Sequence, residues 1–148
     1  MSVLKNRFLK LSILLAFGLI FISATIDLNH LFNYANQDIP EYVIQDNSGN
    51  NPINNKTATL GRVLFYDKKL SSNGSIACAS CHVQEHAFGD PNVQSQGVNG
   101  LAGRHSMRLV NARFSNENSF FWDERAETLE EQTTQPIRDH IEMGFSGT

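Results

Sequence analysis

Two cysteines and a histidine stand together near the middle of the chain, in the run Cys78-Ala79-Ser80-Cys81-His82. Two residues between the cysteines let one helical turn present both sulfurs to the same edge of a flat ligand. The histidine that follows then projects over that ligand and can bind a metal through a ring nitrogen. This order is the attachment sequence of haem c, in which thioether bonds hold the porphyrin. The motif therefore predicts one covalent haem c, attached to Cys78 and Cys81 with His82 as the axial ligand of the iron.

Three other uses of two close cysteines remain open on the residues alone. In an exported chain the pair could form a disulfide, and Cys-x-x-Cys also occurs as a redox dithiol in a βαβ context that this sequence does not predict. The pair with His82 could also be part of a zinc site in which His86 is the fourth ligand, although a second cysteine pair is missing. The histidine directly after Cys81 favours haem over all three.

The first 24 residues have the order of an export signal. Three basic residues precede the mainly apolar run 11–22, and the small residues Ser23 and Ala24 follow it. This order is typical of a secretory signal peptide or an uncleaved anchor, and the run is short for a membrane span, which takes about 20 apolar residues. A buried core helix is the alternative, but the basic flank favours export. We expect a periplasmic or cell-envelope protein that contacts a membrane only through an uncleaved N-terminal segment.

Composition limits the remaining possibilities. The 148 residues fit one domain, with 41% apolar and 18% charged residues, and the net charge of −3 gives no basic surface for nucleic acid. Residues 25–56 are rich in Asn, Asp, Gln and Ser and predict a linker or loosely structured arm. Residues 57–148 then form the haem domain. A long glycine-rich loop is expected at 89–103.

The domain is expected to be mainly α-helical. Apolar spacing predicts a helix over 58–66, with Thr57 as its cap. A short helix over 75–85 should carry the cysteine motif. A third helix is expected over 128–134 because it opens with a Thr-x-x-Glu capping box, and Pro136 stands just beyond its predicted end. No segment alternates for long enough to predict a sheet.

Several further blocks accompany the motif between Leu60 and Gly144. Together they resemble the N-terminal haem domain of bacterial di-haem cytochrome c peroxidases, and more closely their relatives around the enzyme that matures methylamine dehydrogenase. The resemblance implies a cytochrome c-like fold. The matching blocks are Leu60–Asp67, Leu70–Ser72, Cys78–His82, Ala87–Phe88, Arg104–Ser106, Leu109–Asn111, Phe121–Ala126, Leu129–Gln132, Pro136–Ile137 and Glu142–Gly144.

The resemblance implies that hydrogen peroxide meets the iron of this haem in a pocket formed by Trp122, Gln132, Pro136 and Glu142. Glu142 would be the acid–base group that moves a proton from the near peroxide oxygen to the far one, and burial should raise its pKa. Gln132 would hydrogen-bond the peroxide, Trp122 would pack at the haem, and Pro136 would shape the pocket. Without the resemblance, each of the four has an ordinary structural interpretation. Trp122 would be a core residue and Glu142 a solvated acid. Gln132 would lie on a helix surface, and Pro136 would end a helix.

Three features depart from the peroxidases proper. Val98 stands where their loop histidine caps the iron, and because valine cannot bind iron we expect an open sixth position. His105 stands where they place an asparagine at a calcium ion, so the resemblance gives little support for bound calcium. No second Cys-x-x-Cys-His follows, and the chain stops soon after Met143, so we expect a truncated chain whose second haem domain is missing or supplied by another polypeptide.

The predicted function is that of an oxidoreductase. As the N-terminal half of a di-haem peroxidase, it would reduce hydrogen peroxide with electrons from a cytochrome or similar donor protein. One alternative is a single-haem electron carrier, which would need Met107 or Met143 as a sixth iron ligand. Another is an inactive truncated remnant, which would expose an apolar patch where the absent domain should pack.

Overall fold

The computed structural model describes residues 29–49, 51–117 and 119–146. The chain divides into two compact units, residues 1–31 and 32–148, and the second carries every helix and strand of the described residues. The export signal expected at residues 1–24 lies outside the described residues. Within the described ranges, no helix is long and apolar enough to cross a membrane.

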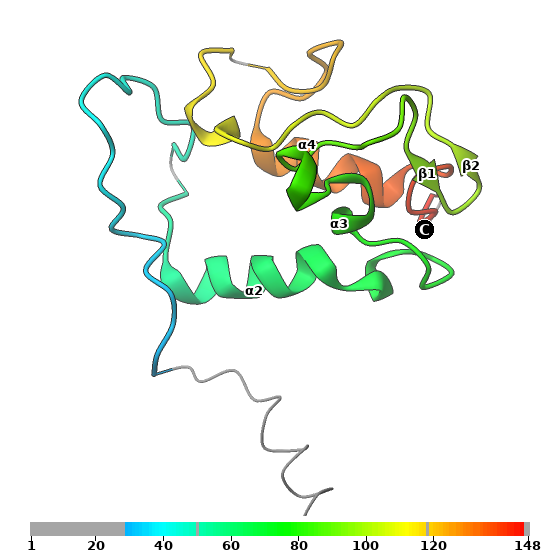
Figure 1. Ribbon diagram of the computed structural model, residues 1–148, viewed down its shortest axis with the longest axis horizontal. Coiled ribbons are helices and arrows are strands. Elements are labelled where there is room, and N and C mark those ends of the chain that lie inside the picture. The colour runs from blue at the N-terminus through cyan, green and yellow to red at the C-terminus, as the bar shows by residue number, and fades with distance from the viewer. Residues whose placement is uncertain (1–28, 50, 118, 147–148) are drawn as a thin grey trace, which may run out of the picture. The chain divides into compact units, whose positions relative to one another are not determined.

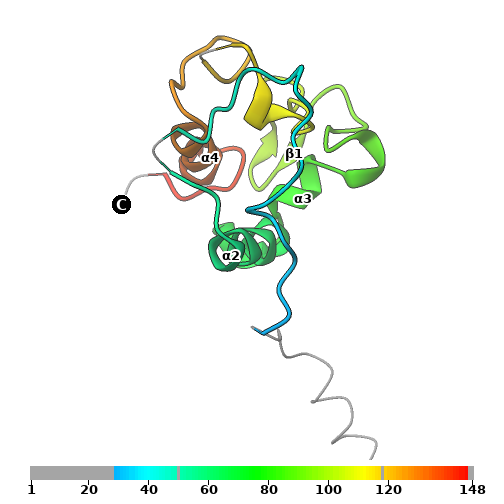
Figure 2. The ribbon, with the colours of Figure 1, turned by 90° about the vertical axis from the view of Figure 1, so that its left-hand side faces the viewer.

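Three α-helices form the framework of the described part of the second unit. Figures 1 and 2 show α3 and α4 on the same side of α2, the longest helix of the described residues. The helices are α2 (Asn55–Tyr66), α3 (Cys78–Cys81) and α4 (Leu129–Arg138), and 3-10 turns lie at Lys68–Leu70, Gln84–His86 and Ala112–Phe114. Helices are therefore the main regular elements of this part of the chain, as expected.

The helix α2 begins three residues earlier than predicted. Asn54 is its N-cap, because its side-chain oxygen accepts a hydrogen bond from the backbone N–H of Thr57 at 2.9 Å. The prediction that Thr57 caps the helix is therefore wrong: Thr57 supplies the capped donor. An asparagine is among the most effective N-caps, and Asn54 stands three residues before Thr57, which is the spacing that the bond requires.

The helix around the cysteines is shorter than expected. It spans only one turn, which closes where the backbone N–H of Ser80 donates to the carbonyl of Ala77 at 2.9 Å. The predicted extension to residue 85 is wrong, because the chain bends back after His82 and Val83 pairs with Gly89 in an isolated antiparallel bridge. The bend contains Ala87 and Phe88 in left-handed conformation, at φ values of 55° and 56°.

The helix α4 extends past Pro136, contrary to the prediction that this proline lies beyond its end. Thr128 caps the helix as expected and accepts from the N–H of Glu131 at 3.1 Å. A proline removes a single backbone donor, and α4 ends two residues after it, where the N–H of Asp139 donates to the carbonyl of Gln135 at 2.9 Å. The helix therefore tolerates Pro136 close to its C-terminal end.

A small hairpin occupies part of the expected glycine-rich loop. Strands β1 (Gln96–Gly97) and β2 (Gly100–Leu101) pair antiparallel, with Gly97 opposite Gly100. No sheet was predicted, because a pair of two-residue strands is too short to give an alternating pattern in the sequence. The hairpin lies beside the C-terminal turn, to which it is hydrogen-bonded through Val98 and Asn99.

The arm before α2 is irregular in its described residues, but two sets of hydrogen bonds fix it to the domain. Near its start, the side-chain oxygen of Asn55 accepts from the backbone N–H groups of Tyr34 and Ala35. Further on, Asp46 accepts two hydrogen bonds from the guanidinium of Arg113, at 2.9 and 2.6 Å. This pairing holds the pKa of Asp46 well below its usual range.

Large side chains are not fully buried anywhere in the described part of the chain. The buried apolar residues there are Ala77, Ala102, Ala126 and Met143. On α2, the apolar face that predicted the helix is open to solvent, with Leu60 57% and Val63 43% exposed. A domain of this size ordinarily buries several large aliphatic or aromatic side chains. The protein atoms alone thus leave the centre of the domain without a packed core.

Candidate functional site

A cavity lies where a packed core is missing. The cysteine motif lines it with Cys78, Cys81 and His82, and we call it the motif cavity. The rest of its lining is mostly apolar and includes Phe65, Ile76, Leu109 and Met143. Gln132 and Pro136 of α4 form the opposite wall, together with Glu142 from the turn that follows the helix.

His82 is prepared to act as a neutral ligand. Its Nδ1 lies 2.9 Å from the backbone carbonyl of Phe88, and because a carbonyl only accepts, Nδ1 carries the proton. The other ring nitrogen, Nε2, is then unprotonated and free to bind a metal. Burial lowers the pKa of His82 and so also favours the neutral ring. The bend at Ala87 and Phe88 is what brings this carbonyl back to the histidine.

The two cysteines are free and half-buried, and they are not bonded to each other. Burial raises the pKa of both thiols and so favours the protonated, uncharged form. His86, the fourth ligand that a zinc site would need, is exposed and does not line the motif cavity. No cluster of three or more metal-binding side chains occurs within the described ranges.

These features fit a covalently attached haem. Both sulfurs and the histidine border one cavity, as a porphyrin edge and its axial ligand require. The apolar lining suits the face of the macrocycle, and a group of that size would take the place of the fully buried large side chains that the described residues lack. Cys78, Cys81 and His82 are therefore the residues that would hold the haem.

Glu142 is half-buried and borders three cavities at once. Besides the motif cavity, it lines a larger one next to Trp122, the Trp122 cavity, and a third one between α4 and Arg125, the side cavity. Gln132 lines the first two and Pro136 all three. Burial is the main reason that the pKa of Glu142 is raised, and the nearby carboxylate of Asp139 adds to it. A carboxyl group whose pKa is raised in this way keeps its proton to a higher pH than a free one, which suits a general acid or base.

Backbone hydrogen bonds from distant segments fix the turn that carries Glu142. The N–H of Val98 donates to the carbonyl of Glu142 at 2.9 Å, and that of Ser72 donates to Met143 at 2.8 Å. The side chain of Asp139 accepts from the N–H of Glu142 at 3.0 Å. Gly97 allows this approach, because a Cβ there would collide with the carbonyl of Ile141. The acid is therefore positioned by contacts that are remote in sequence.

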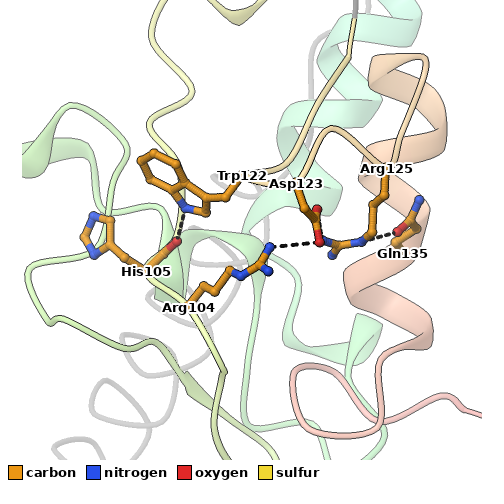
Figure 3. A network of polar contacts seen from close by, with 6 residues as sticks. All are labelled: Arg104, His105, Trp122, Asp123, Arg125 and Gln135. Carbon is orange, nitrogen blue, oxygen red and sulfur yellow. Dashed lines mark hydrogen bonds and ion pairs between the residues drawn. The ribbon is translucent and has the colours of Figure 1, made fainter.

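Trp122 lies on a short strained loop and is not part of the core. Phe120 and Ala126 close the loop with an antiparallel bridge, and Phe121 and Glu124 within it have φ values of 71° and 56°. The indole of Trp122 is 60% exposed and its N–H donates to the carbonyl of His105 at 2.8 Å (Figure 3). It lines the Trp122 cavity together with His82 and Glu142, but not the motif cavity.

The other candidate ligands occupy different positions. Met143 is only 4% exposed and lines the motif cavity, whereas Met107 lines the Trp122 cavity. His105 also lines the Trp122 cavity, where its Nδ1 lies 2.8 Å from the carbonyl of Asn92. Val98, expected to leave the sixth position open, does not line the motif cavity and packs beside Gly144.

Comparison with known proteins assigns this arrangement to a family. The family model of di-haem cytochrome c peroxidases matches residues 55–148, which is more than half of the chain. The chain belongs to the di-haem cytochrome c peroxidase family. The resemblance inferred from the sequence is thereby confirmed, and the family implies haem c as the cofactor.

Individual relatives show how much of such a protein this chain represents. The methylamine utilization protein MauG of Methylophilus methylotrophus is 37% identical over 98 residues, which cover 64% of this chain and 28% of that protein. The cytochrome c peroxidase Ccp of Escherichia coli is 36% identical over 93 residues, 62% of this chain and 20% of the relative. The chain thus spans less than a third of these curated relatives.

Solved structures give the same result for the fold. A MauG-like protein associated with microbial copper homeostasis matches with a TM-score of 0.66 and 37% identity, over 75% of this chain and 35% of that one. The diheme peroxidase BthA from Burkholderia thailandensis E264 matches with a TM-score of 0.58 and 28% identity, over 64% and 28% of the two chains. The described domain therefore has the fold of the haem domains in this family.

Sequence reasoning assigned no role to Arg125, although this residue lines two of the three cavities beside Glu142. Its side chain contacts Asp123 and Gln135 and lies over the ring of Phe121. The only signal in the sequence was its place in the matching block Phe121–Ala126. An exposed arginine near an aspartate is otherwise an ordinary surface feature.

Proposed function

We propose that this chain binds one haem c through Cys78, Cys81 and His82 and reduces hydrogen peroxide at that haem. In the proposal it acts outside the cytoplasm as the N-terminal haem domain of a di-haem peroxidase. Electrons come from a donor protein by way of a second haem domain, on this polypeptide or another. The main support is that Glu142, Gln132 and Pro136 line the same cavity as the haem-attachment motif.

The residues of the chain divide the work around the cofactor. When bound, the haem would supply the redox-active iron and would pass the two electrons needed to reduce peroxide. His82 would hold the iron through its unprotonated Nε2, with the Phe88 carbonyl fixing the orientation of the ring. The apolar lining of the motif cavity excludes bulk water and so strengthens each polar contact made inside it.

Glu142 is the proposed acid–base residue. Reduction of one peroxide molecule to two waters consumes two electrons and two protons, and the O–O bond breaks most easily when the leaving oxygen is protonated. The Glu142 carboxylate takes a proton from the near oxygen and delivers it to the far one. The Gln132 amide is the proposed hydrogen-bond partner of the peroxide, and Pro136 shapes the wall beside it. Trp122 is assigned to packing at the haem edge through the Trp122 cavity.

The decisive experiment follows the absorption of the purified ferric haem protein after mixing with peroxide. We expect a high-spin spectrum that changes rapidly with peroxide in the wild type. In Glu142→Gln the change should be about 100-fold slower or more, which is the usual contribution of a positioned acid–base group. Glu41→Gln, an exposed acid on the arm, serves as the control and should react like the wild type. An equally fast reaction in Glu142→Gln would contradict the proposal.

A single-haem electron carrier is the second candidate, and one observation favours it. Met143 is buried and lines the motif cavity, where its sulfur is available as a sixth ligand. This candidate predicts a low-spin ferric spectrum that is indifferent to peroxide and becomes high-spin in Met143→Leu. The same spectra therefore distinguish the two functions.

A further inference from the structure

The loop at residues 120–126, which we call the Trp122 loop, is attached to the segment before it at two neighbouring points (Figure 3). The indole N–H of Trp122 donates to the carbonyl of His105 at 2.8 Å, and the adjacent residues Asp123 and Arg104 form an ion pair, also at 2.8 Å. Two parallel contacts add a geometric specificity that one contact lacks. The ion pair therefore restrains the direction of the indole as well as its distance from the segment.

Asp123 is the centre of this arrangement. Its Oδ2 accepts from Arg104 at 2.8 Å, and its Oδ1 accepts from Nη1 of Arg125 at 2.7 Å. Arg125 in turn donates through Nε to the Gln135 side chain of α4 at 2.9 Å. One carboxylate thus ties the loop to the Arg104 segment with one oxygen and, through Arg125, to α4 with the other.

The Trp122 loop depends on such restraints because its backbone is strained. Phe121 and Glu124 have φ values of 71° and 56°, which residues other than glycine rarely adopt. Conformations of this kind persist only where the surrounding structure over-determines them. Trp122 is 60% exposed, so packing alone does not hold its indole. An isolated exposed ion pair contributes little, but charges linked in a network are an exception, and Asp123 links two cations.

We propose that Asp123 is a positioning residue that holds the indole of Trp122 in one orientation by binding Arg104 and Arg125 at the same time. The inference rests on the proposed function, in which Trp122 packs at the haem edge, and adds the device that keeps it there. Asp123 lines the Trp122 cavity but not the motif cavity. In this inference it therefore acts through the indole and not on the reacting atoms.

The chain supplies its own probe, because Trp122 is its only tryptophan. A nearby haem shortens the fluorescence lifetime of an indole by energy transfer, so long-lived emission counts the molecules whose indole has moved away. In the full haem-loaded chain, with haem content matched by absorption, Asp123→Ala should raise the long-lived fraction about 2–10-fold, the effect of losing two exposed ion pairs. Arg104→Gln breaks one pair and should raise it less. Asp123→Glu keeps the charge and should restore most of the wild-type value.

Asp46→Ala is the matched control. The side chains of Asp46 and Asp123 are equally exposed, at 39%, and Asp46 also uses both carboxylate oxygens, but it binds Arg113 and lies on the arm. Its loss should leave the long-lived fraction of Trp122 emission unchanged. The inference is overturned if Asp123→Ala leaves that fraction in place, or if Asp46→Ala raises it equally. Should Asp123→Ala fail to fold, Arg104→Gln decides, and an unchanged fraction in that variant overturns the inference.

The reaction with peroxide separates this inference from the proposed function. If Asp123→Ala releases the indole but peroxide reacts equally fast in Glu142→Gln, the proposed function fails and the inference stands. If Glu142→Gln slows the reaction while the indole stays in place in Asp123→Ala, the inference alone fails.

Discussion

The two walls of the motif cavity are built in opposite ways. The wall with Cys78, Cys81 and His82 comes from one short segment, and a single helical turn with one bend sets its geometry. The wall with Glu142 depends on bonds from Ser72, Val98 and Asn99, more than 40 residues away. The proposed attachment of the cofactor therefore depends on local structure, whereas its proposed reactivity depends on the assembled domain. The two walls should respond differently to substitution.

The largest expected effect is on the local wall. Replacing both Cys78 and Cys81 by alanine should abolish covalent haem entirely, because no other cysteine exists in the chain to form a thioether. Haem staining of the denatured protein on a gel measures this. Ala79→Ser, between the two cysteines, keeps both sulfurs and should retain the haem. Covalent haem in the double variant would refute the assignment of the attachment site.

A smaller effect is expected where the remote wall meets the hairpin. Gly97→Ala places a Cβ against the carbonyl of Ile141 and 2.8 Å from the Cα of Glu142, so the turn must move. We expect a loss of about 1–3 kcal/mol in unfolding free energy, typical of overpacking, while covalent haem is retained. Chemical denaturation measures the first and gel staining the second. Gly103→Ala, where a Cβ meets no atom within 4 Å, is the matched control and should change neither.

The smallest effect concerns the charge of Glu142 itself. Because its folded pKa is raised, the stability that it contributes is fully present below the ordinary value of 4.5 and is lost as pH rises through the folded pKa. Glutamine resembles the protonated acid at every pH. Glu142→Gln should therefore melt at a higher temperature than the wild type at pH 7, and the difference should vanish below about pH 4. A constant difference across this range would show that the pKa of Glu142 is not raised on folding.

The sequence predicted several elements well and missed others for definable reasons. The predictions of the C-terminal end of α2 and of the Thr128 cap of α4 were correct, because apolar spacing and capping chemistry act over a few residues. The continuation of α4 past Pro136 was missed, since a proline near a helix end costs only one bond. The hairpin was missed because its strands are held by two glycines and by contacts with a turn some 40 residues further on.

The sequence by itself predicted the haem-attachment residues, since Cys78, Cys81 and His82 lie within one five-residue run and one turn suffices to align them. It also determined the family, through blocks spread over more than half of the chain. Only the tertiary structure decided that Glu142 is half-buried beside Asp139 and Arg125, and that Trp122 is exposed on a strained loop. Burial and charge proximity depend on segments that meet in space, and no local pattern in the sequence encodes those distances.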